Sequence, residues 1–421
     1  MRQILSHRGL RLVFVANLVS MLGSGMNAAA VIWHMLQLTH SEMSLGKLLV
    51  LQTVPALILL PLSGVIIDRE DRRHLIMLLD FGRGAVILAV ALLALAGRVQ
   101  LWHLYFMNTL VAAGFWLFWP TINALIQELT PEGDFVGTNT LLLGSVQSGW
   151  LIAGALVGFL YDRIGLGWIL MIDFATYAVS FLCYLMVRRG RVIVKPPPAH
   201  AGAVAREGWE KFWHELREGM IYVKTRPRII LVGTSWALFI AAMLTQGVVS
   251  APLSDRIMHA GAMGYGWFNA GWGLGAFSSV LYSPALIRLW KARPAAGISL
   301  GLLALCLVAL PFSKWLWIAV ALYILMGAGR GVGGTALGSE MMEIVPKHFM
   351  GRVQNTFYFA GTLLQLGLSL LVAAVAHRVS LTLGFAIIGI GYAVGCLSAV
   401  WPAPTMAESA VETEPQLTTS D

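Results

Sequence analysis

Long apolar runs separated by short charged loops make up most of this chain. Each run has about 20 residues, the length of an α-helix that crosses a hydrocarbon core about 30 Å thick. Open strands are not expected in such runs, because lipid cannot satisfy unpaired backbone groups. The pattern predicts an all-α membrane protein with about twelve transmembrane helices, at 11–33, 44–66, 75–96, 102–126, 139–161, 166–187, 229–253, 263–289, 294–311, 316–337, 356–376 and 381–401.

The predicted helices fall into two sets of six around one long polar stretch. Four parts are therefore expected: an N-terminal six-helix half at 1–187, a cytoplasmic linker at 188–228, a C-terminal six-helix half at 229–402, and a disordered cytoplasmic tail at 403–421. Apolar residues recur at helical spacing within the linker, at Trp209, Phe212, Trp213, Leu216 and Met220. This spacing predicts an amphipathic helix on the inner membrane surface, which tethers the halves or, as the alternative, senses lipid.

The two halves also share a local sequence pattern. ALIQELTPEGDFVGTN follows the fourth predicted helix, and LGSEMMEIVPKHFMGRVQN follows the tenth. Glu128 and Glu343 are separated by 343 − 128 = 215 residues, and Pro131 and Pro346 by the same offset. Two related, pseudo-symmetric halves indicate duplication around a central binding cavity.

Composition and charge support the membrane interpretation. Hydrophobic residues make up 57% and charged residues 12% of the chain, against roughly 45–50% and 25% in soluble domains. Most of the basic residues lie in the loops on one side of the predicted bundle, which places both termini in the cytoplasm. The net charge of +8 is therefore explained by topology, and no nucleic-acid partner is expected.

No enzyme chemistry is expected from the sequence. No nucleophile–base pair, phosphate-binding loop or metal cluster is visible, so we expect neither enzymatic activity, nor a cofactor, nor a metal. The three cysteines lie inside apolar runs and are interpreted as packing residues. His34, His103 and His377 lie at predicted helix ends, where an interfacial position explains them.

The loop after the second predicted helix carries a recognisable motif. GVIIDREDRR resembles the G-x-x-x-D-R-x-G-R-R signature of the major facilitator superfamily, with Asp71 in place of the second glycine. The matching residues are Gly64, Asp68, Arg69, Arg72 and Arg73. Together with ELREGMIYVKTRPRI and VPKHFMGRVQN, this variant is similar to the branch of macrolide-efflux proteins and enterobactin exporters. The resemblance implies a monomeric secondary transporter of small molecules in a bacterial-type inner (plasma) membrane.

The motif is expected to form a gate at the cytoplasmic mouth. Asp68 and the neighbouring arginines can form charged contacts that break and re-form as the two halves move. The alternative is that the arginines only anchor the topology. Glu128 and Glu343 lie at symmetric helix ends, where we expect them to pair with gate arginines or to remain solvated.

Acidic residues inside the predicted helices are candidates for coupling transport to protons, because such groups are costly in lipid. Asp80 and Arg83 are three residues apart on one helix face and are expected to neutralise each other. Asp173 is the other coupling candidate. Ser24 stands where many relatives carry an acid, and Ala155 where they carry proline, so this chain departs from the proton-antiporter pattern.

The resemblance also implies which polar groups face the substrate. The first, fourth, seventh and tenth helices line the cavity in this superfamily, which favours Asn27, Asn123 and Gln246. Trp116 and Trp119 are expected to stack on an amphipathic substrate. Arg330, within GAGRGVGG, is expected to meet an anionic substrate or to pair with an acid. The competing interpretation is helix–helix hydrogen bonding for the amides and packing for the aromatic rings.

The sequence thus favours an exporter of amphipathic compounds, such as drugs or siderophores, driven by the proton gradient. A mostly apolar cavity with scattered amides and aromatic rings suits such molecules better than sugars. A lipid or lysolipid translocator on the same fold is the first alternative. The second is a non-transporting membrane receptor or scaffold, which the gate motif argues against.

Overall fold

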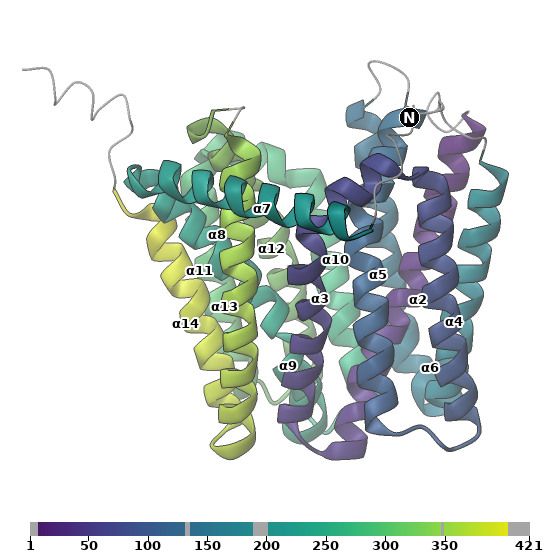
Figure 1. The fold of residues 1–421 in the computed structure, drawn as a ribbon. Helices are drawn as coiled ribbons and strands as arrows, with labels where there is room; N and C mark the ends of the chain where they lie inside the picture. Colours follow the sequence, from purple (N-terminus) through teal and green to yellow (C-terminus); the bar gives the residue numbers. More distant parts are fainter. Residues whose placement is uncertain (1–6, 131–134, 188–200, 347–348, 403–421) are drawn as a thin grey trace, which may run out of the picture.

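The chain folds into a bundle of long helices (Figure 1). The computed structural model describes residues 7–130, 135–187, 201–346 and 349–402, and every regular element in these ranges is helical. The first half contains α2 (Arg8–Thr39), α3 (Glu42–Arg69), α4 (Arg72–Leu95), α5 (Leu101–Leu129) and α6 (Phe135–Met186). The second half contains α8 (Pro227–Thr245), α9 (Gly247–Pro252), α10 (Gly261–Trp290), α11 (Ala292–Ala309), α12 (Leu316–Ile344), α13 (Met350–Arg378) and α14 (Leu381–Val400).

Two of the crossings differ from simple helices. The helix α6 contains both predicted helices at 139–161 and 166–187 and bends between them at Gly165, whose φ of 71° is open to glycine but strained for other residues. The seventh crossing is interrupted instead: α8 ends at Thr245, α9 follows, and a π-helical turn at Leu253–Ile257 completes it. Breaks of this kind often lie at functional sites in membrane helices.

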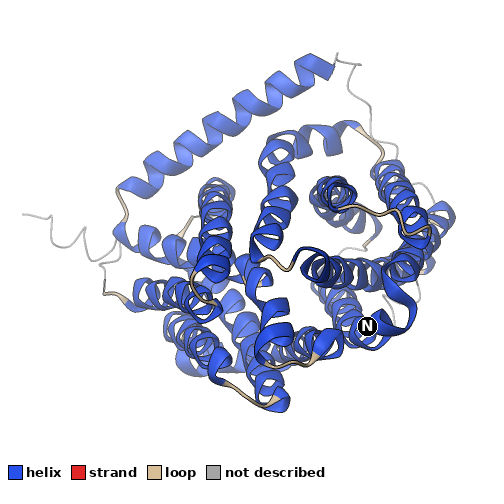
Figure 2. Cartoon of the chain, turned by 90° about the horizontal axis from the view of Figure 1, so that it is seen from below, coloured by secondary structure: helices blue, strands red, loops and turns tan. Residues whose placement is uncertain are grey.

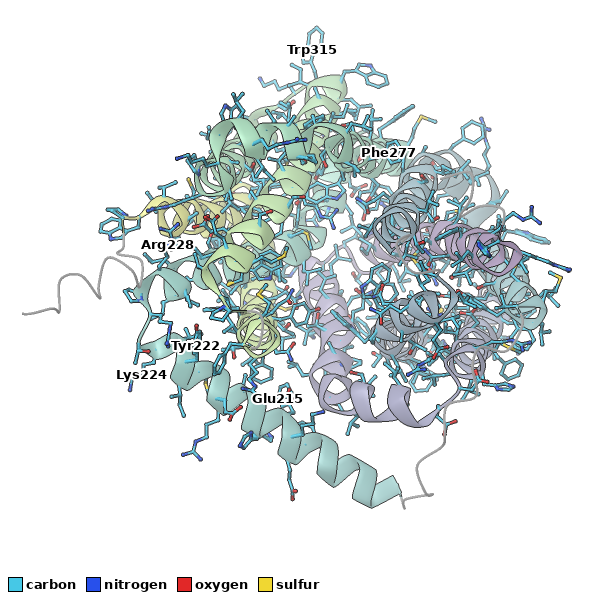
Figure 3. All side chains as sticks on the ribbon, turned by 90° about the horizontal axis from the view of Figure 1, so that it is seen from above. Glu215, Tyr222, Lys224, Arg228, Phe277 and Trp315 are labelled. Atoms are coloured by element: carbon cyan, nitrogen blue, oxygen red, sulfur yellow. The ribbon has the colours of Figure 1, made fainter. Side chains whose placement is uncertain are left out.

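The expected number of crossings is confirmed. Ten segments of the described chain are long and apolar enough to span a membrane, with α6 counted once. Counting α6 as two crossings and adding α10 gives twelve, six on either side of α7 (Ala201–Lys224). Large apolar side chains cover the outer surface, including Leu281 (82% exposed) and Trp315 (72% exposed, Figure 3). An apolar surface of this extent is unusual for a protein in water, but it is expected where the side chains face lipid.

The two halves repeat the same neighbour relationships. In the first half α2 packs on α6, α3 on α5 and α4 on α6. In the second half α8 packs on α14, α10 on α12 and α11 on α14, at the corresponding places. The described chain is therefore an all-α membrane fold of two pseudo-symmetric six-helix halves, as the sequence predicted.

A pair of arginines repeats the symmetry at atomic detail. Arg73, at the start of α4, donates from Nε to the Tyr184 carbonyl at 2.6 Å and from Nη2 to the Leu185 carbonyl at 2.7 Å, at the end of α6. Arg293, at the start of α11, donates in the same way to the Ala399 and Val400 carbonyls at 3.0 and 2.8 Å, at the end of α14. Each guanidinium satisfies carbonyls that a helix end leaves without partners.

The amphipathic helix expected in the linker is present as α7. It lies across one side of the bundle, outside the ring of crossings (Figures 1 and 2), and contacts α13 and α3, which belong to different halves. Phe212 and Leu216 are buried, whereas Trp213 and Met220 are about half exposed. Residues 188–200 and the predicted tail at 403–421 lie outside the described residues.

The contact between α7 and α13 is tight. Glu218 pairs with Arg352 at 3.1 Å, and the Tyr222 ring stacks on Phe349 at 4.2 Å between centroids. A Cβ atom added to Gly219 would lie 2.7 Å from the Arg352 carbonyl, so only glycine allows this approach. Figure 3 shows Glu215, Tyr222 and Lys224 along this helix. The helix α7 lies near one end of the bundle (Figure 1), and each end corresponds to one side of the membrane. We call the end near α7 the α7 side, and the other end the opposite side.

Candidate functional site

The two halves are joined by charged contacts on the opposite side. Glu42, the first residue of α3, has no exposed side-chain surface and accepts from Arg256 Nη1 at 2.5 Å. His377, near the end of α13, lies 3.2 Å from the other Glu42 oxygen. Arg256 also donates to the His40 carbonyl at 2.6 Å. We refer to Glu42, Arg256 and His377 as the acidic latch, because one buried carboxylate of the first half holds two groups of the second.

Further contacts between the halves lie close to this latch. Gln37 donates to Asp255 at 3.0 Å, and the rings of Trp33 and Tyr265 stack at 6.0 Å. These residues lie at the end of α2 and on either side of the loop that precedes α10. The latch is therefore part of a wider closure at this end of the bundle.

Backbone contact between α6 and α10 also joins the halves on this side. A Cβ added to Gly158 would lie 2.8 Å from the Gly266 Cα, and one added to Gly266 would lie 2.5 Å from the Gly158 Cα. A Cβ added to Gly154 would meet the Ala270 nitrogen at 2.7 Å. We call these three glycines the glycine seam. Because no side chain separates the two backbones there, the halves approach as closely as helices can.

The predicted gate motif lies on the α7 side. The side chains of Asp68 and Arg69 and the surroundings of Gly64 are not among those that the structure describes, so the gate role of these residues stays a prediction. Arg72 pairs with Glu128 at the end of α5. Of the two alternatives for Glu128, pairing with an arginine of the motif is therefore the one that the structure has. Both residues belong to the first half.

Asp71 and Arg73 have local structural roles in the motif. Asp71, which stands where the motif has its second glycine, caps α4 by accepting from the backbone nitrogens of Arg73 and His74. The described contacts of Arg73 likewise stay within the first half, at the end of α6. Neither contact bridges the two halves, and the gate role of Arg73 stays a prediction.

The second-half counterpart of Glu128 behaves differently. Glu343 is exposed, and the described part of the chain gives it no ion-pair partner. Glu340, one turn earlier on α12, is buried and pairs with Arg228 at the start of α8. The offset of 215 residues predicts that Glu343 is the acid that corresponds to Glu128. The acid that pairs with an arginine is instead Glu340, one helical turn earlier.

The coupling candidates occupy two buried positions in the first half. Asp80 and Arg83 form an ion pair at 2.5 Å, with side-chain exposures of 0% and 2%. Ser180 donates to the second Asp80 oxygen at 2.6 Å, and the Arg83 guanidinium lies over the Phe118 and Tyr177 rings. This geometry agrees with the expected mutual neutralisation of Asp80 and Arg83.

Asp173, by contrast, is bonded to neutral groups. Asn27 Nδ2 donates to its carboxylate at 2.7 Å, and Thr176 lies 3.4 Å from the other oxygen. A Cβ added to Gly23 would lie 2.5 Å from this second oxygen, so α2 presses directly against the carboxylate. Among the described buried acids of the first half, Asp80 and Glu42 form ion pairs at hydrogen-bond distance, and Asp173 forms none. Asn27 therefore forms a hydrogen bond to Asp173, a contact within the first half.

One of the two aromatic candidates reaches the boundary between the halves. Trp116 donates to the Gln52 carbonyl at 3.3 Å, and its ring packs edge-on against Tyr358 of α13 at 5.9 Å. Trp119 stacks on Phe115 of its own helix. Asn123 donates to the Trp119 carbonyl at 3.0 Å, a bond within α5. Trp116 therefore reaches the second half, whereas the described contacts of Trp119 and Asn123 stay in the first.

The second-half candidates lie on α12 and at the break of the seventh crossing. Gln246 is buried between α8 and α9, and its carbonyl accepts from the Ser250 hydroxyl at 2.9 Å. Arg330 donates from Nε to the Met243 sulfur at 3.0 Å and lies 6.0 Å from the Trp272 ring. No carboxylate partner of Arg330 is found in the described part of the chain.

The acidic latch was missed by the sequence analysis. Glu42 and Arg256 lie outside the predicted helices at 44–66 and 229–253, and His377 was assigned to the interface. Glu42 and Arg256 are 214 residues apart, and no local pattern relates them. Within the described residues no cluster of His, Cys, Asp or Glu has the arrangement of a metal site.

Comparison with known proteins identifies a family. The family model described as Major Facilitator Superfamily matches residues 13–367. The MFS-type transporter YkuC of Bacillus subtilis (strain 168) is 23% identical over 379 residues, covering 87% of this chain and 85% of YkuC. YfiS of the same organism is 23% identical over 366 residues, covering 85% and 84%. Macrolide efflux protein A of Streptococcus pyogenes is 23% identical over 229 residues, 53% of each protein.

Solved transporter structures have the same fold. A POT family transporter crystallised with a thioalcohol-conjugated peptide superimposes with a TM-score of 0.73 at 16% identity, covering 93% of this chain and 95% of that one. The nucleoside transporter NupG superimposes with a TM-score of 0.73 at 12% identity, covering 93% and 98%. At these identities the similarity concerns the fold and not the substrate.

Proposed function

We propose, from the premise that this chain belongs to the Major Facilitator Superfamily and is a membrane transporter, that it exports amphipathic small molecules by alternating access in exchange for protons. In such a cycle two bundles rock around a site near the middle of the membrane. The two pseudo-symmetric halves and their separate sets of contacts fit this cycle.

The observation that carries the proposal is the position of the closing contacts. The acidic latch and the glycine seam join the halves on the opposite side. On the α7 side, the described pairs Arg72–Glu128 and Arg228–Glu340 each remain within one half. This arrangement is that of a transporter closed at one end, which can close at the other by exchanging one set of contacts for another.

Orientation follows from the basic residues. Most Lys and Arg residues near the ends of the crossings belong to the α7 side, including Arg72 and Arg73 at the start of α4, and α7 itself adds further basic residues. By the positive-inside rule, this distribution supports a cytoplasmic α7 side, in the bacterial-type inner membrane that we propose. The state described is, in this orientation, closed to the outside.

Proton coupling is assigned to Asp173. Carboxyl groups held within the membrane by neutral partners are typical of proton relays. Asp80 is less suited, because Arg83 compensates its charge at 2.5 Å. The proposal of efflux is supported by the similarity to macrolide efflux protein A and by Trp116 of α5, whose ring contacts Tyr358 of the second half.

The proposal is tested with inverted membrane vesicles whose lumen is acidified. Lipophilic cations, macrolides and catechol siderophores are added in turn, and proton release is followed with a pH-sensitive dye. We expect one class of compound to release protons, and Asp173→Asn to abolish the release. Asp162→Asn, which changes an exposed acid of the same helix, is the matched control and should behave as the unchanged protein. If the folded protein releases no protons with any compound of the panel, the proposed exchange is contradicted.

A further inference from the structure

Arg330 places a permanent positive charge in the middle of a membrane-spanning helix. It lies 14 residues from either end of α12, since 330 − 316 and 344 − 330 are both 14. At 1.5 Å per residue, each end is about 21 Å away. A guanidinium does not lose its proton in proteins, and a charge at this depth is costly unless another group compensates it.

The described surroundings of Arg330 offer only weak compensation. Its Nε donates to the sulfur of Met243 at 3.0 Å, and its Cζ lies 6.0 Å from the Trp272 ring centroid. A thioether is a weak acceptor, and 6 Å is the outer limit of a cation–π contact. The remaining donors of the guanidinium fork have no carboxylate partner within the described residues.

The acids buried in the described helices are already engaged. Each has a hydrogen-bonded partner of its own: Glu42 with Arg256, Asp80 with Arg83, Asp173 with Asn27, and Glu340 with Arg228. None of them is bonded to Arg330. Within the described residues, no acid therefore compensates the charge of Arg330, which is left for a group from outside the bundle.

The face of α12 that carries Arg330 packs against aromatic side chains of α8, so the surroundings of the guanidinium are apolar. Gly334 and Gly338 follow Arg330 at helical spacing, so this face lacks side chains for two turns. Across from it, α8 presents aromatic rings: Phe239 lies 3.6 Å from a Cβ added to Gly334, and Trp236 lies 3.7 Å from one added to Gly338. Met243 continues the same face of α8 toward the guanidinium.

We infer that Arg330 binds the anionic group of the transported molecule, and that the substrates are amphipathic anions with a carboxylate or sulfonate on an apolar body. This inference rests on the proposed transport function and specifies its substrate class. A guanidinium fork binds such groups through two parallel hydrogen bonds. Met243 and the Trp272 ring, which lie beside the guanidinium, would contact the apolar body.

Two probes that share a ring system separate the contributions. Anilinonaphthalene sulfonate carries the anion, and N-phenylnaphthylamine lacks it. Binding of each is measured on the full chain in lipid nanodiscs, from the concentration dependence of the melting temperature. We expect the sulfonate to bind at least about tenfold more tightly than the amine, as loss of a charge-assisted hydrogen bond would imply.

Three variants of the chain make the test specific to Arg330. Arg330→Gln should remove the preference for the sulfonate and leave binding of the amine unchanged. Arg330→Lys should retain a reduced preference, because it keeps the charge and loses the fork. Arg163→Gln removes an exposed charge from α6 and should retain the full preference.

Two outcomes would overturn the inference: equal binding of the probes by the unchanged protein, or an undiminished sulfonate preference in Arg330→Gln. If Arg330→Gln does not fold, the test uses the unchanged protein and Arg330→Lys. Equal binding of the two probes by the unchanged protein, or an undiminished sulfonate preference in Arg330→Lys, would then overturn the inference. Flux measurements separate the inference from the proposed function. Equal export of anionic and neutral compounds would refute the Arg330 site alone, whereas Arg330-dependent sulfonate binding without export would refute transport alone.

Discussion

The Glu42 carboxylate lies 2.5 Å from the Arg256 guanidinium, and the two residues belong to different halves of the molecule. Glu42 is fully buried, whereas the Arg256 side chain is 40% exposed. Removing one partner of a buried ion pair leaves the other charge without compensation, which is more costly than losing the contact itself. The stability of the closure on the opposite side should therefore depend strongly on Glu42.

Replacing Glu42 should open the opposite side. In a background without Cys183, Cys306 and Cys396, we expect Glu42→Gln to raise the labelling rate of Ala262→Cys, a buried position beside Gly158, by about tenfold, equivalent to about 1.4 kcal/mol. The measurement uses a membrane-impermeant maleimide added from that side. Glu343→Gln, which removes an exposed acid, is the control and should leave the rate unchanged. Equal rates in both variants would show that the latch does not hold the closure.

Replacing a glycine of the glycine seam by a larger residue should also open the opposite side, because the added side chain would separate α6 from α10. Gly158→Val places a side chain against the Gly266 backbone, which cannot move aside as a side chain can. We expect the distance between spin labels at Lys47→Cys on α3 and Arg378→Cys on α13 to increase, measured by electron paramagnetic resonance. Gly144→Val carries the same substitution on α6 at a position with nothing within 4 Å. A distance that stays constant in Gly158→Val would mean that the seam is not required for closure.

Breaking the Asp80–Arg83 pair should reduce stability. Asp80→Asn leaves a guanidinium that is 2% exposed without its counter-charge, and such losses are about 3–5 kcal/mol. We expect a clear fall in the melting temperature of the purified protein. The double variant Asp80→Asn/Arg83→Gln removes both charges and should recover most of the loss. If the double variant is no more stable than the single one, the two residues are not a compensating pair.

Arg73 allows the gate prediction to be separated from a local role. Because Arg73 binds the carbonyls at the end of α6, Arg73→Ala should increase amide hydrogen exchange there, and Arg293→Ala should do so at the end of α14. Lost hydrogen bonds to a charged group are worth about 1.5–3 kcal/mol each. Mass-spectrometric exchange on both variants measures this. A loss of transport in Arg73→Ala, with exchange unchanged, would instead favour the gate role.

The extent of the helices could be predicted from the sequence, because a spanning helix needs a long apolar run wherever it lies in the bundle. The long polar stretch and the offset between Glu128 and Glu343 likewise indicated two related halves. These features are local or periodic along the chain. The Asp80–Arg83 pair was predictable for the same reason, since its members are three residues apart on one helix.

The contacts between distant segments could not be predicted in this way. Glu42 meets Arg256 across 214 residues, and Asn27 meets Asp173 across 146. Hydropathy shows that a residue is on a helix but not which helix faces it. Asn27 was for this reason assigned to the substrate cavity, and the structure places its amide on the Asp173 carboxylate.

The docking of α7 has a geometric consequence for the motion of the molecule. The helix is fixed to α13 through Gly219 and Glu218, and only Thr225 and Arg226 separate it from α8. It therefore follows the second half at this end, whereas its packing against α3 of the first half must slide or break when the halves rotate. Its 24 residues span about 36 Å, so a rotation of the second half by about 10° would displace the far end by about 6 Å. Small changes between the halves thus become large displacements at the membrane surface near Ala201.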